Sequence, residues 1–216
     1  MRSSAASDVY KRQIMRKDPF FTRNTFVGQG KWNIPLVHKQ TIDTSNLSLL
    51  ACSDTRKNDS IENRCKGVHF FVDDYRFTST YSNPERTLEK YSQYAFLLTP
   101  DFSTYADMGL WRQIESVAKN RWVGAYWQSK GLHVIPTISW STTRSFEFCF
   151  DGVEKNSIVA VSTLGCKKAK LRFMRGYDAM YKKLEPEKVI CFGNTFPEMV
   201  GDIIKINYIE SRRVVR

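Results

Sequence analysis

Three consecutive segments decide the fold of this 216-residue chain: Leu97-Leu98-Thr99-Pro100-Asp101, the segment from Leu110 to Gly131, and Leu132-His133-Val134-Ile135-Pro136-Thr137-Ile138. The first and third are apolar runs, as expected of strands that are buried on both faces. The middle segment repeats apolar residues at helical spacing, which predicts a helix over Leu110–Ser129 with Gly131 just beyond its end. A buried strand, a helix-length crossover and a second buried strand are typical of a parallel βαβ unit.

Similar patterns flank this unit on both sides. Apolar runs of strand length occupy residues 68–72, 158–161, 189–192 and 203–206, and helices are predicted from Pro84 onward and over 168–184. Crossovers long enough for helices indicate right-handed parallel connections. We therefore predict an α/β fold with a mostly parallel sheet of about six strands, either open or partial-barrel-like, since a complete eight-fold barrel usually needs about 250 residues.

Some segments leave alternatives open. Residues 146–150 fit either a short strand or an apolar plug, and Pro136 predicts a bulge or kink because proline lacks the amide donor of a central strand. Short strands fit residues 32–37 and 47–52. We predict a single domain in which residues 15–66 form an N-terminal cap or edge of the sheet and residues 67–216 form the α/β core.

The first residues stand apart from this pattern. Residues 3–13 resemble the in-frame translation of a sequencing-library adapter, a contaminant familiar in metagenomic assemblies. The segment lacks the apolar stretch of a signal peptide. We therefore interpret residues 1–14 as a non-native leader and expect them to be disordered. The net charge of the remaining residues is still positive.

Composition limits the protein class. The net charge of +11 favours polyanions such as nucleic acid, although scattered charges more commonly serve solubility alone. Five cysteines without a CxxC pair indicate reduced thiols, two of them (Cys149 and Cys191) within apolar runs. No apolar stretch reaches the roughly 18 residues of a membrane span. We expect a cytoplasmic protein with no membrane partner.

Several motifs resemble a known family, the domain of unknown function 4417. They are Gly67-Val-His-Phe-Phe-Val-Asp-Asp-Tyr75, Pro100-Asp-Phe-Ser103, Arg121-Trp-Val-Gly-Ala-Tyr-Trp-Gln128, Val134-Ile-Pro-Thr-Ile-Ser-Trp140, Phe148-Cys-Phe-Asp-Gly152 and Val159-Ala-Val-Ser-Thr163. Their order and length make the resemblance specific. It implies a prokaryotic protein often carried by phages and other mobile elements. It implies no reaction and no catalytic residues.

The polar residues that follow the predicted strands are the candidate site. In parallel α/β folds the carboxyl ends of the strands gather at one edge, where ligands bind. The residues there are Asp73, Asp74, Asp101, Ser103, Trp140, Ser141, Arg144, Ser162, Thr163, Cys166, Lys167 and Asn194. This convergence predicts a ligand pocket.

The aspartates are the candidate catalytic groups. Carboxylates from neighbouring strands can hold a divalent cation such as Mg²⁺ or Mn²⁺, or divide acid and base roles. Asp73 and Asp74 cannot both point inward from an extended backbone, so Asp101 pairs with one of them at most. Alternatively, Asp74 and Asp101 cap the turns that follow their strands.

Other side chains fit the binding of a phosphate or a base. Trp140 is placed to stack on a base or sugar, whereas core packing is the commoner role for helical Tyr126 or Trp127. Arg144 and Lys167 can neutralise a phosphate. Cys166 beside Lys167 is either an activated thiol or a structural cysteine, and the second is the commoner case.

These features lead to one hypothesis and one alternative. The chain is predicted to carry a strand-end pocket for a phosphate-bearing small molecule or nucleic acid, with Asp73 and Asp101 as catalytic residues and Asp74, Ser103, Trp140, Arg144, Ser162, Thr163, Lys167 and Asn194 as binding residues. Metal-assisted chemistry is compatible with this site. The alternative is a nucleic-acid-binding module without catalysis. The sequence decides neither whether it is an enzyme nor its oligomeric state.

Overall fold

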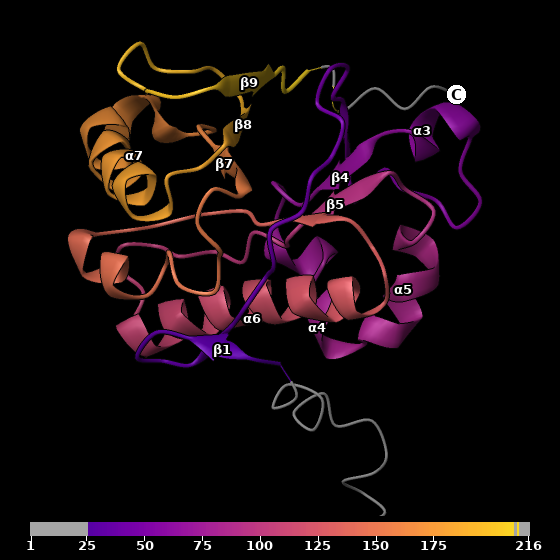
Figure 1. The fold of residues 1–216 in the computed structure, drawn as a ribbon, viewed down its shortest axis with the longest axis horizontal. Helices are drawn as coiled ribbons and strands as arrows, with labels where there is room; N and C mark the ends of the chain where they lie inside the picture. Colours follow the sequence, from indigo (N-terminus) through magenta and orange to yellow (C-terminus); the bar gives the residue numbers. More distant parts are fainter. Residues whose placement is uncertain (1–25, 210, 212–216) are drawn as a thin grey trace, which may run out of the picture.

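A computed structural model describes residues 26–209 and 211 of the chain, so the predicted leader over residues 1–14 lies outside the described residues. Figure 1 shows strands backed by helices, and the elements follow one another as β1 (Gly28–Gln29), β2 (Ile34–Pro35), β3 (Leu49–Ala51), α3 (Ile61–Arg64), β4 (Gly67–His69), η1 (Asp74–Arg76), α4 (Ser79–Ser82), α5 (Pro84–Tyr91), β5 (Phe96–Leu98), α6 (Leu110–Ser129), β6 (Val134–Ile135), η2 (Thr143–Glu147), β7 (Ile158–Ser162), η3 (Cys166–Ala169), α7 (Lys170–Leu184), β8 (Lys188–Phe192) and β9 (Ile203–Ile206).

The strands form parallel sheets whose order follows the chain. One sheet has the order β3-β4-β5-β6 and another β7-β8-β9, while β1 and β2 form a separate antiparallel hairpin. A parallel bridge between Thr137 and Ala160 connects the two parallel sheets, and the amide of Ile138 donates to the carbonyl of Ala160 at 2.8 Å. The predicted α/β fold with a parallel sheet is confirmed, and the described strands do not close into a barrel.

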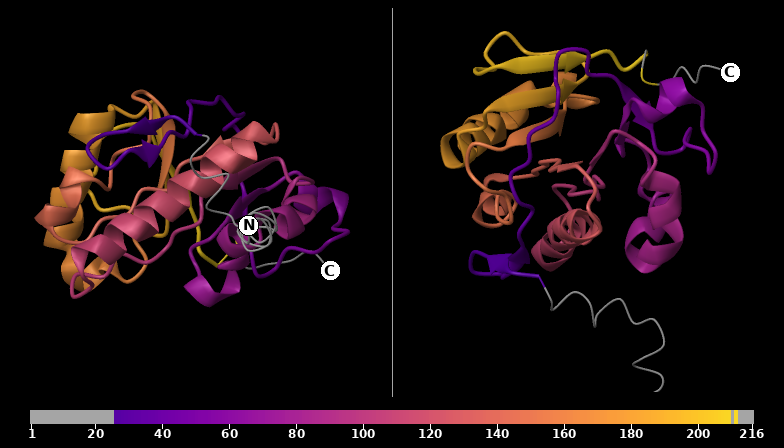
Figure 2. Two further views of the ribbon diagram at one scale, coloured as in Figure 1. Left: turned by 90° about the horizontal axis from the view of Figure 1, so that it is seen from below. Right: turned by 45° about the vertical axis from the view of Figure 1, so that its right-hand side comes forward.

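Helices α5, α6 and α7 pack on one face of the sheets. Figures 1 and 2 show α6 running along the molecule beneath the strands, with α4 and α5 toward one end and α7 toward the other. Trp122 and Trp127 of α6 pack with the strands of the first sheet, and Val117 of the same helix packs with those of the second. Helix α6 therefore joins the two sheets into one core.

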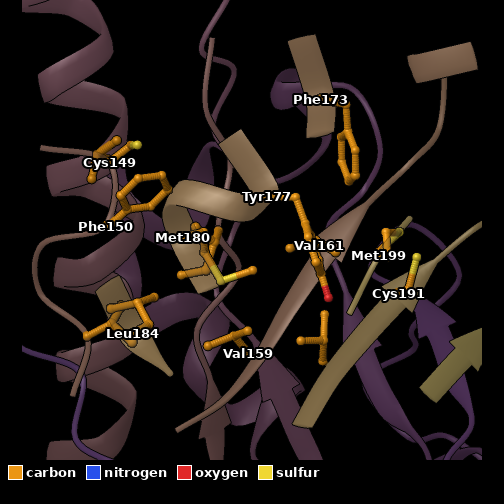
Figure 3. Close-up of a cluster of buried hydrophobic side chains, with 14 of the residues drawn as sticks. Cys149, Phe150, Val159, Val161, Phe173, Tyr177, Met180, Leu184, Cys191 and Met199 are labelled. Atoms are coloured by element: carbon orange, nitrogen blue, oxygen red, sulfur yellow. The ribbon is translucent and has the colours of Figure 1, made fainter. Parts of the chain in front are cut away.

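The second sheet is covered by the apolar face of α7. Figure 3 shows Phe173, Tyr177 and Met180 of this helix beside Val159 and Val161 of β7. These five side chains are at most 7% exposed. The apolar periodicity of residues 168–184 thus predicted both the helix and its buried face.

The opposite faces of the two sheets share one inner cluster, so the joined sheet is curved. This cluster contains Leu49 of β3 together with Ile206 of β9, at the two ends of the strand series. The rings of His69 in β4 and Phe192 in β8 lie 4.3 Å apart between centroids. Curvature of this kind brings the carboxyl ends of distant strands toward a common centre.

The irregular segments settle the alternatives left open by the sequence. Residues 143–147 form the 3-10 helix η2, and Phe148 and Phe150 are buried after it, so this segment is an apolar plug and not a strand. Strand β6 ends before Pro136, and the amide of Thr137 donates to Oγ1 of Thr99 at 2.7 Å. Ladder pairing between β5 and β6 therefore stops at Pro136, the position where the sequence predicts a bulge or kink. The N-terminal segment supplies the edge strand β3. The predicted boundary between this segment, residues 15–66, and the core, residues 67–216, stays a prediction.

Two buried polar residues of α6 fix the chain where the strands end. Arg121, 1% exposed, donates from Nη1 to the carbonyl of Thr137 at 2.8 Å, from Nη2 to that of Cys149 at 3.0 Å and from Nε to that of Asp151 at 3.1 Å. Asn120 donates to the carbonyl of Pro100 at 2.8 Å. Burial lowers the pKa of Arg121 to about 10, so the guanidinium stays charged at neutral pH. Buried carbonyls left without these donors would destabilise the fold.

We expect Arg121→Met to lower the free energy of unfolding by about 3 kcal/mol, because it keeps the apolar stem but removes the donor of the buried carbonyls of Cys149 and Asp151 and leaves that of Thr137 with Asn120 alone. Urea unfolding followed by circular dichroism measures the change. Arg112→Met, at an exposed position of the same helix, is the matched control and should differ from the wild type by no more than about 0.5 kcal/mol. Equal losses in the two variants would contradict the structural role of Arg121.

Candidate functional site

A cavity of about 970 Å³ opens at the carboxyl ends of the parallel strands. Its walls come from the segments that follow β3, β4, β5, β6 and β7, and from the start of α7. Pockets for small molecules usually measure about 300–1,000 Å³. The curved sheet thus forms a hollow at the edge where parallel α/β proteins bind ligands.

The structure places about half of the predicted site residues along this cavity. The ones that line it are Asp73, Asp101, Ser103, Trp140 and Ser162, together with Ser141 and Cys166. Four others, Asp74, Thr163, Lys167 and Asn194, do not line it, and Arg144 lines a second hollow beside it.

Asp101 is the most perturbed acid of the cavity. Its Oδ1 atom is buried and has no hydrogen-bond partner among the described residues, although part of the residue surface faces the cavity. Burial raises the pKa of Asp101 to about 6, and the negative charge of Asp74 adds to the rise, while a hydrogen bond from Ser139 and the charge of Arg121 oppose it. A carboxyl with this pKa can accept or donate a proton near neutral pH.

The two neighbouring aspartates after β4 have different environments. Asp74 accepts hydrogen bonds from the amide of Ser103 at 3.1 Å and from its hydroxyl at 2.9 Å, so its carboxylate positions the loop after β5. Asp73 lies at the cavity wall with 72% of its side chain exposed, and Nε of Arg76 lies 3.7 Å from its Oδ2. Among residues 26–209 and 211, no three His, Cys, Asp or Glu side chains converge to hold a metal ion.

Trp140 presents an aromatic ring to the cavity. The residue is partly buried, and its ring lies 5.1 Å from that of Phe173 between centroids. A Cβ atom at Gly176 would lie 2.1 Å from Nε1 of Trp140, so only glycine leaves room for the indole against α7. Tyr126 and Trp127, by contrast, are core residues at 6% and 0% exposed.

The remaining predicted residues lie around the rim. Thr163 donates from its amide to the carbonyl of Phe192 at 3.0 Å, which ties together the ends of β7 and β8. Lys167 in η3 and Asn194 after β8 are exposed. Burial raises the pKa of the Cys166 thiol, which keeps it protonated and favours the structural role over an activated thiol.

The sequence predictions missed two arginines and a glutamine. Arg76 and Arg172 line the cavity, the second from the first turn of α7. Gln113, 1% exposed, donates to the carbonyls of Tyr105 at 3.1 Å and Met108 at 2.8 Å and holds the loop that forms one wall. A sequence signal existed for Gln113, because a polar residue within the apolar stripe of an amphipathic helix must find a buried partner.

Comparison with known proteins identifies the family. Residues 26–210 match the domain of unknown function (DUF4417). The chain belongs to this family. It is 35% identical over 196 residues to the Gene 1 protein of Mycobacterium phage L5, covering 89% of this chain and 85% of that protein, and 33% identical over 196 residues to the Gene 1 protein of Mycobacterium phage D29, covering 89% and 72%. No solved structure matches the chain.

The resemblance predicted from the motifs is thereby confirmed, including the phage relatives. Every residue that lines the cavity lies within the segment matched to DUF4417. No helix of the described residues is long and apolar enough to cross a membrane.

We expect Asp101→Asn to stabilise this DUF4417 protein by about 2 kcal/mol at pH 7.5. The pKa of Asp101 in the folded chain, about 6, lies above that of an unfolded aspartate, so ionisation of the buried carboxyl costs stability as the pH rises from about 4 to 6. Asparagine avoids this cost. The difference between variant and wild type should therefore shrink as the pH falls below 6.

Chemical denaturation at several pH values measures this difference. Asp73→Asn, which removes an exposed carboxyl from the same cavity, is the control and should change stability by less than about 0.5 kcal/mol. An Asp101→Asn variant no more stable than the wild type at pH 7.5 would refute the desolvation of this carboxyl.

Proposed function

We propose that the protein binds a phosphate-bearing ligand of nucleotide size in the strand-end cavity and that Asp101 acts on it as a general acid or base. The observation that carries this proposal is the buried, unpartnered Oδ1 of Asp101 at the wall of a cavity that also contains Arg76 and Arg172. Strongly perturbed acids in a cleft are typical of functional sites.

The charges around the cavity support a phosphate ligand. Arg172 forms no ion pair with any described residue, so its guanidinium is available for the bidentate contact that arginine makes with phosphate. Arg76 forms an ion pair with Asp73, in which Nε lies 3.7 Å from Oδ2 of the exposed carboxylate. Such an exposed pair is weak, and a phosphate can replace the carboxylate. Ser103 and Ser162 add hydroxyl groups to the same walls.

The aromatic lining supports a ligand with a flat ring. Trp140 is held by Phe173 and by the space at Gly176, so its ring is ordered without a ligand. Stacking of a base on a fixed aromatic ring contributes about 1–3 kcal/mol to binding. A nucleotide combines this ring with the phosphate that the arginines favour.

In this proposal a divalent cation binds together with the ligand. Mg²⁺ commonly binds through one or two carboxylates together with ligand phosphates, and the cavity walls carry the carboxylates of Asp54, Asp73 and Asp101. The phage relatives support a mobile-element association, and the reduced cysteines support a cytoplasmic protein.

The alternative, a nucleic-acid-binding module without catalysis, is favoured by the net charge of +11. The two functions differ in what Asp101 does. A binding module should retain its affinity in the Asp101→Asn variant over the whole pH range, whereas an acid–base site should lose the pH dependence of its chemistry between about pH 5 and 7.

We expect Arg172→Ala to weaken the binding of adenosine 5′-monophosphate about tenfold, because a charge-assisted hydrogen bond to phosphate contributes roughly 1.5–3 kcal/mol. Binding of adenosine, which lacks the phosphate, should stay within twofold of the wild type. Isothermal titration calorimetry with and without Mg²⁺ measures both ligands. Arg175→Ala, an exposed arginine of the same helix that does not line the cavity, is the matched control.

Wild-type protein that binds no adenosine 5′-monophosphate at millimolar concentration would refute a nucleotide site. Equal losses in Arg172→Ala and Arg175→Ala would show that the phosphate binds elsewhere.

A further inference from the structure

A second hollow of about 550 Å³ adjoins the main cavity. Both are lined by Ala106, so the loop after β5 separates them. The second hollow is walled on one side by the residues leading into α6, through Trp111, and on the other by residues 142–144 at the start of η2.

The second hollow carries an exposed aromatic ring and a free cation. Trp111, on the first turn of α6, is 70% exposed, so its ring is open to a ligand. Gly109 leaves room for it, since a Cβ there would lie 3.0 Å from Nε1 of Trp111. Arg144 is exposed and forms no ion pair within the described part of the chain.

The wall shared by the two hollows is held in place. Gln113 binds the carbonyls of Tyr105 and Met108 through its amide, and its Oε1 accepts a hydrogen bond of 2.5 Å from the hydroxyl of Ser141. Gln113 thus ties the loop after β5 to the segment after β6. Two hollows with a fixed partition can bind two successive units of one ligand.

We propose that the second hollow binds the nucleotide next to the one in the main cavity, so that the ligand is a single-stranded nucleic acid. This inference rests on the proposed function of the main cavity. The two hollows together present Trp140, Tyr105 and Trp111 as rings, with Arg172 and Arg144 beside them. Rings that stack bases and cations that hold phosphates are the combination that single-strand-binding proteins use.

Charge and shape favour this occupant over the other macromolecules. The net charge of +11 attracts a polyanion. The carboxylate of Asp107 on the wall of the second hollow repels a phosphate there. Stacking on Trp111 is therefore the main contact there, and Arg144 supplies the phosphate contact. The paired bases of a duplex are stacked on one another and offer no free face to these rings, so the strand is unpaired.

The experiment compares ligands of different length. Binding of adenosine 5′-monophosphate and of single-stranded pentaadenylate, in ribo and deoxy forms, is measured by calorimetry at one salt concentration. The variants are Trp111→Ala and Arg144→Ala. The matched controls are Trp32→Ala and Arg86→Ala, which change an exposed tryptophan and an exposed arginine that line neither hollow. Thermal melting confirms that each variant is folded.

We expect the pentanucleotide to bind at least tenfold more tightly than the mononucleotide. Trp111→Ala should weaken pentanucleotide binding about tenfold and Arg144→Ala about threefold, and both should leave mononucleotide binding within twofold of the wild type. The control variants should bind both ligands as the wild type does. A preference for the ribo or the deoxy form identifies which nucleic acid is bound.

Two results overturn the inference and leave the nucleotide site standing. In the first, the mononucleotide binds but the pentanucleotide binds no more tightly. In the second, the pentanucleotide binds more tightly but Trp111→Ala and Arg144→Ala behave as their controls. Failure of both ligands to bind the wild type overturns the proposed function and this inference together.

Discussion

The architecture of the candidate site depends on the side-chain hydrogen bonds that Asn120 and Arg121 of α6 donate to backbone carbonyls. These carbonyls belong to Pro100 after β5, to Thr137 after β6 and to the turn at residues 149–151. Pro100 and Thr137 follow the last ladder residues of their strands, where a backbone acceptor needs another partner, and residues 149–151 lie in the irregular segment after η2. One helix therefore fixes two strand ends and this turn, and the cavity walls after β5 and β6 begin next to the two strand ends.

The same arrangement sets the electrostatics of the cavity. The buried charge of Arg121 lowers the pKa of Asp101, but burial of the carboxyl raises it by more, and the result is a pKa of about 6. A protein selected for stability alone would neutralise or replace such a carboxyl. The desolvation of Asp101 supports the proposal that this carboxyl is functional, since desolvated groups persist where activity requires them.

Curvature of the joined sheet explains why one cavity collects residues from so many strands. The helices pack on one face, and the inner cluster between Leu49 and Ile206 draws the strand series around the other. The loops after β3 to β7 then meet around one hollow. The DUF4417 match spans residues 26–210 and includes this whole arrangement, so the phage Gene 1 relatives are the proteins in which to compare the cavity residues.

The sequence by itself determined the strands, α6, α7 and the edge of the sheet where the polar residues gather, because apolar periodicity reports local burial directly. It also predicted that Asp101 and Trp140 lie at this edge, and the structure places both on the cavity wall. Only the tertiary structure decided that Asp74 positions Ser103 and that Arg172 faces the cavity. These roles depend on contacts between residues far apart in the chain, and no local pattern encodes the direction in which a side chain points across a loop.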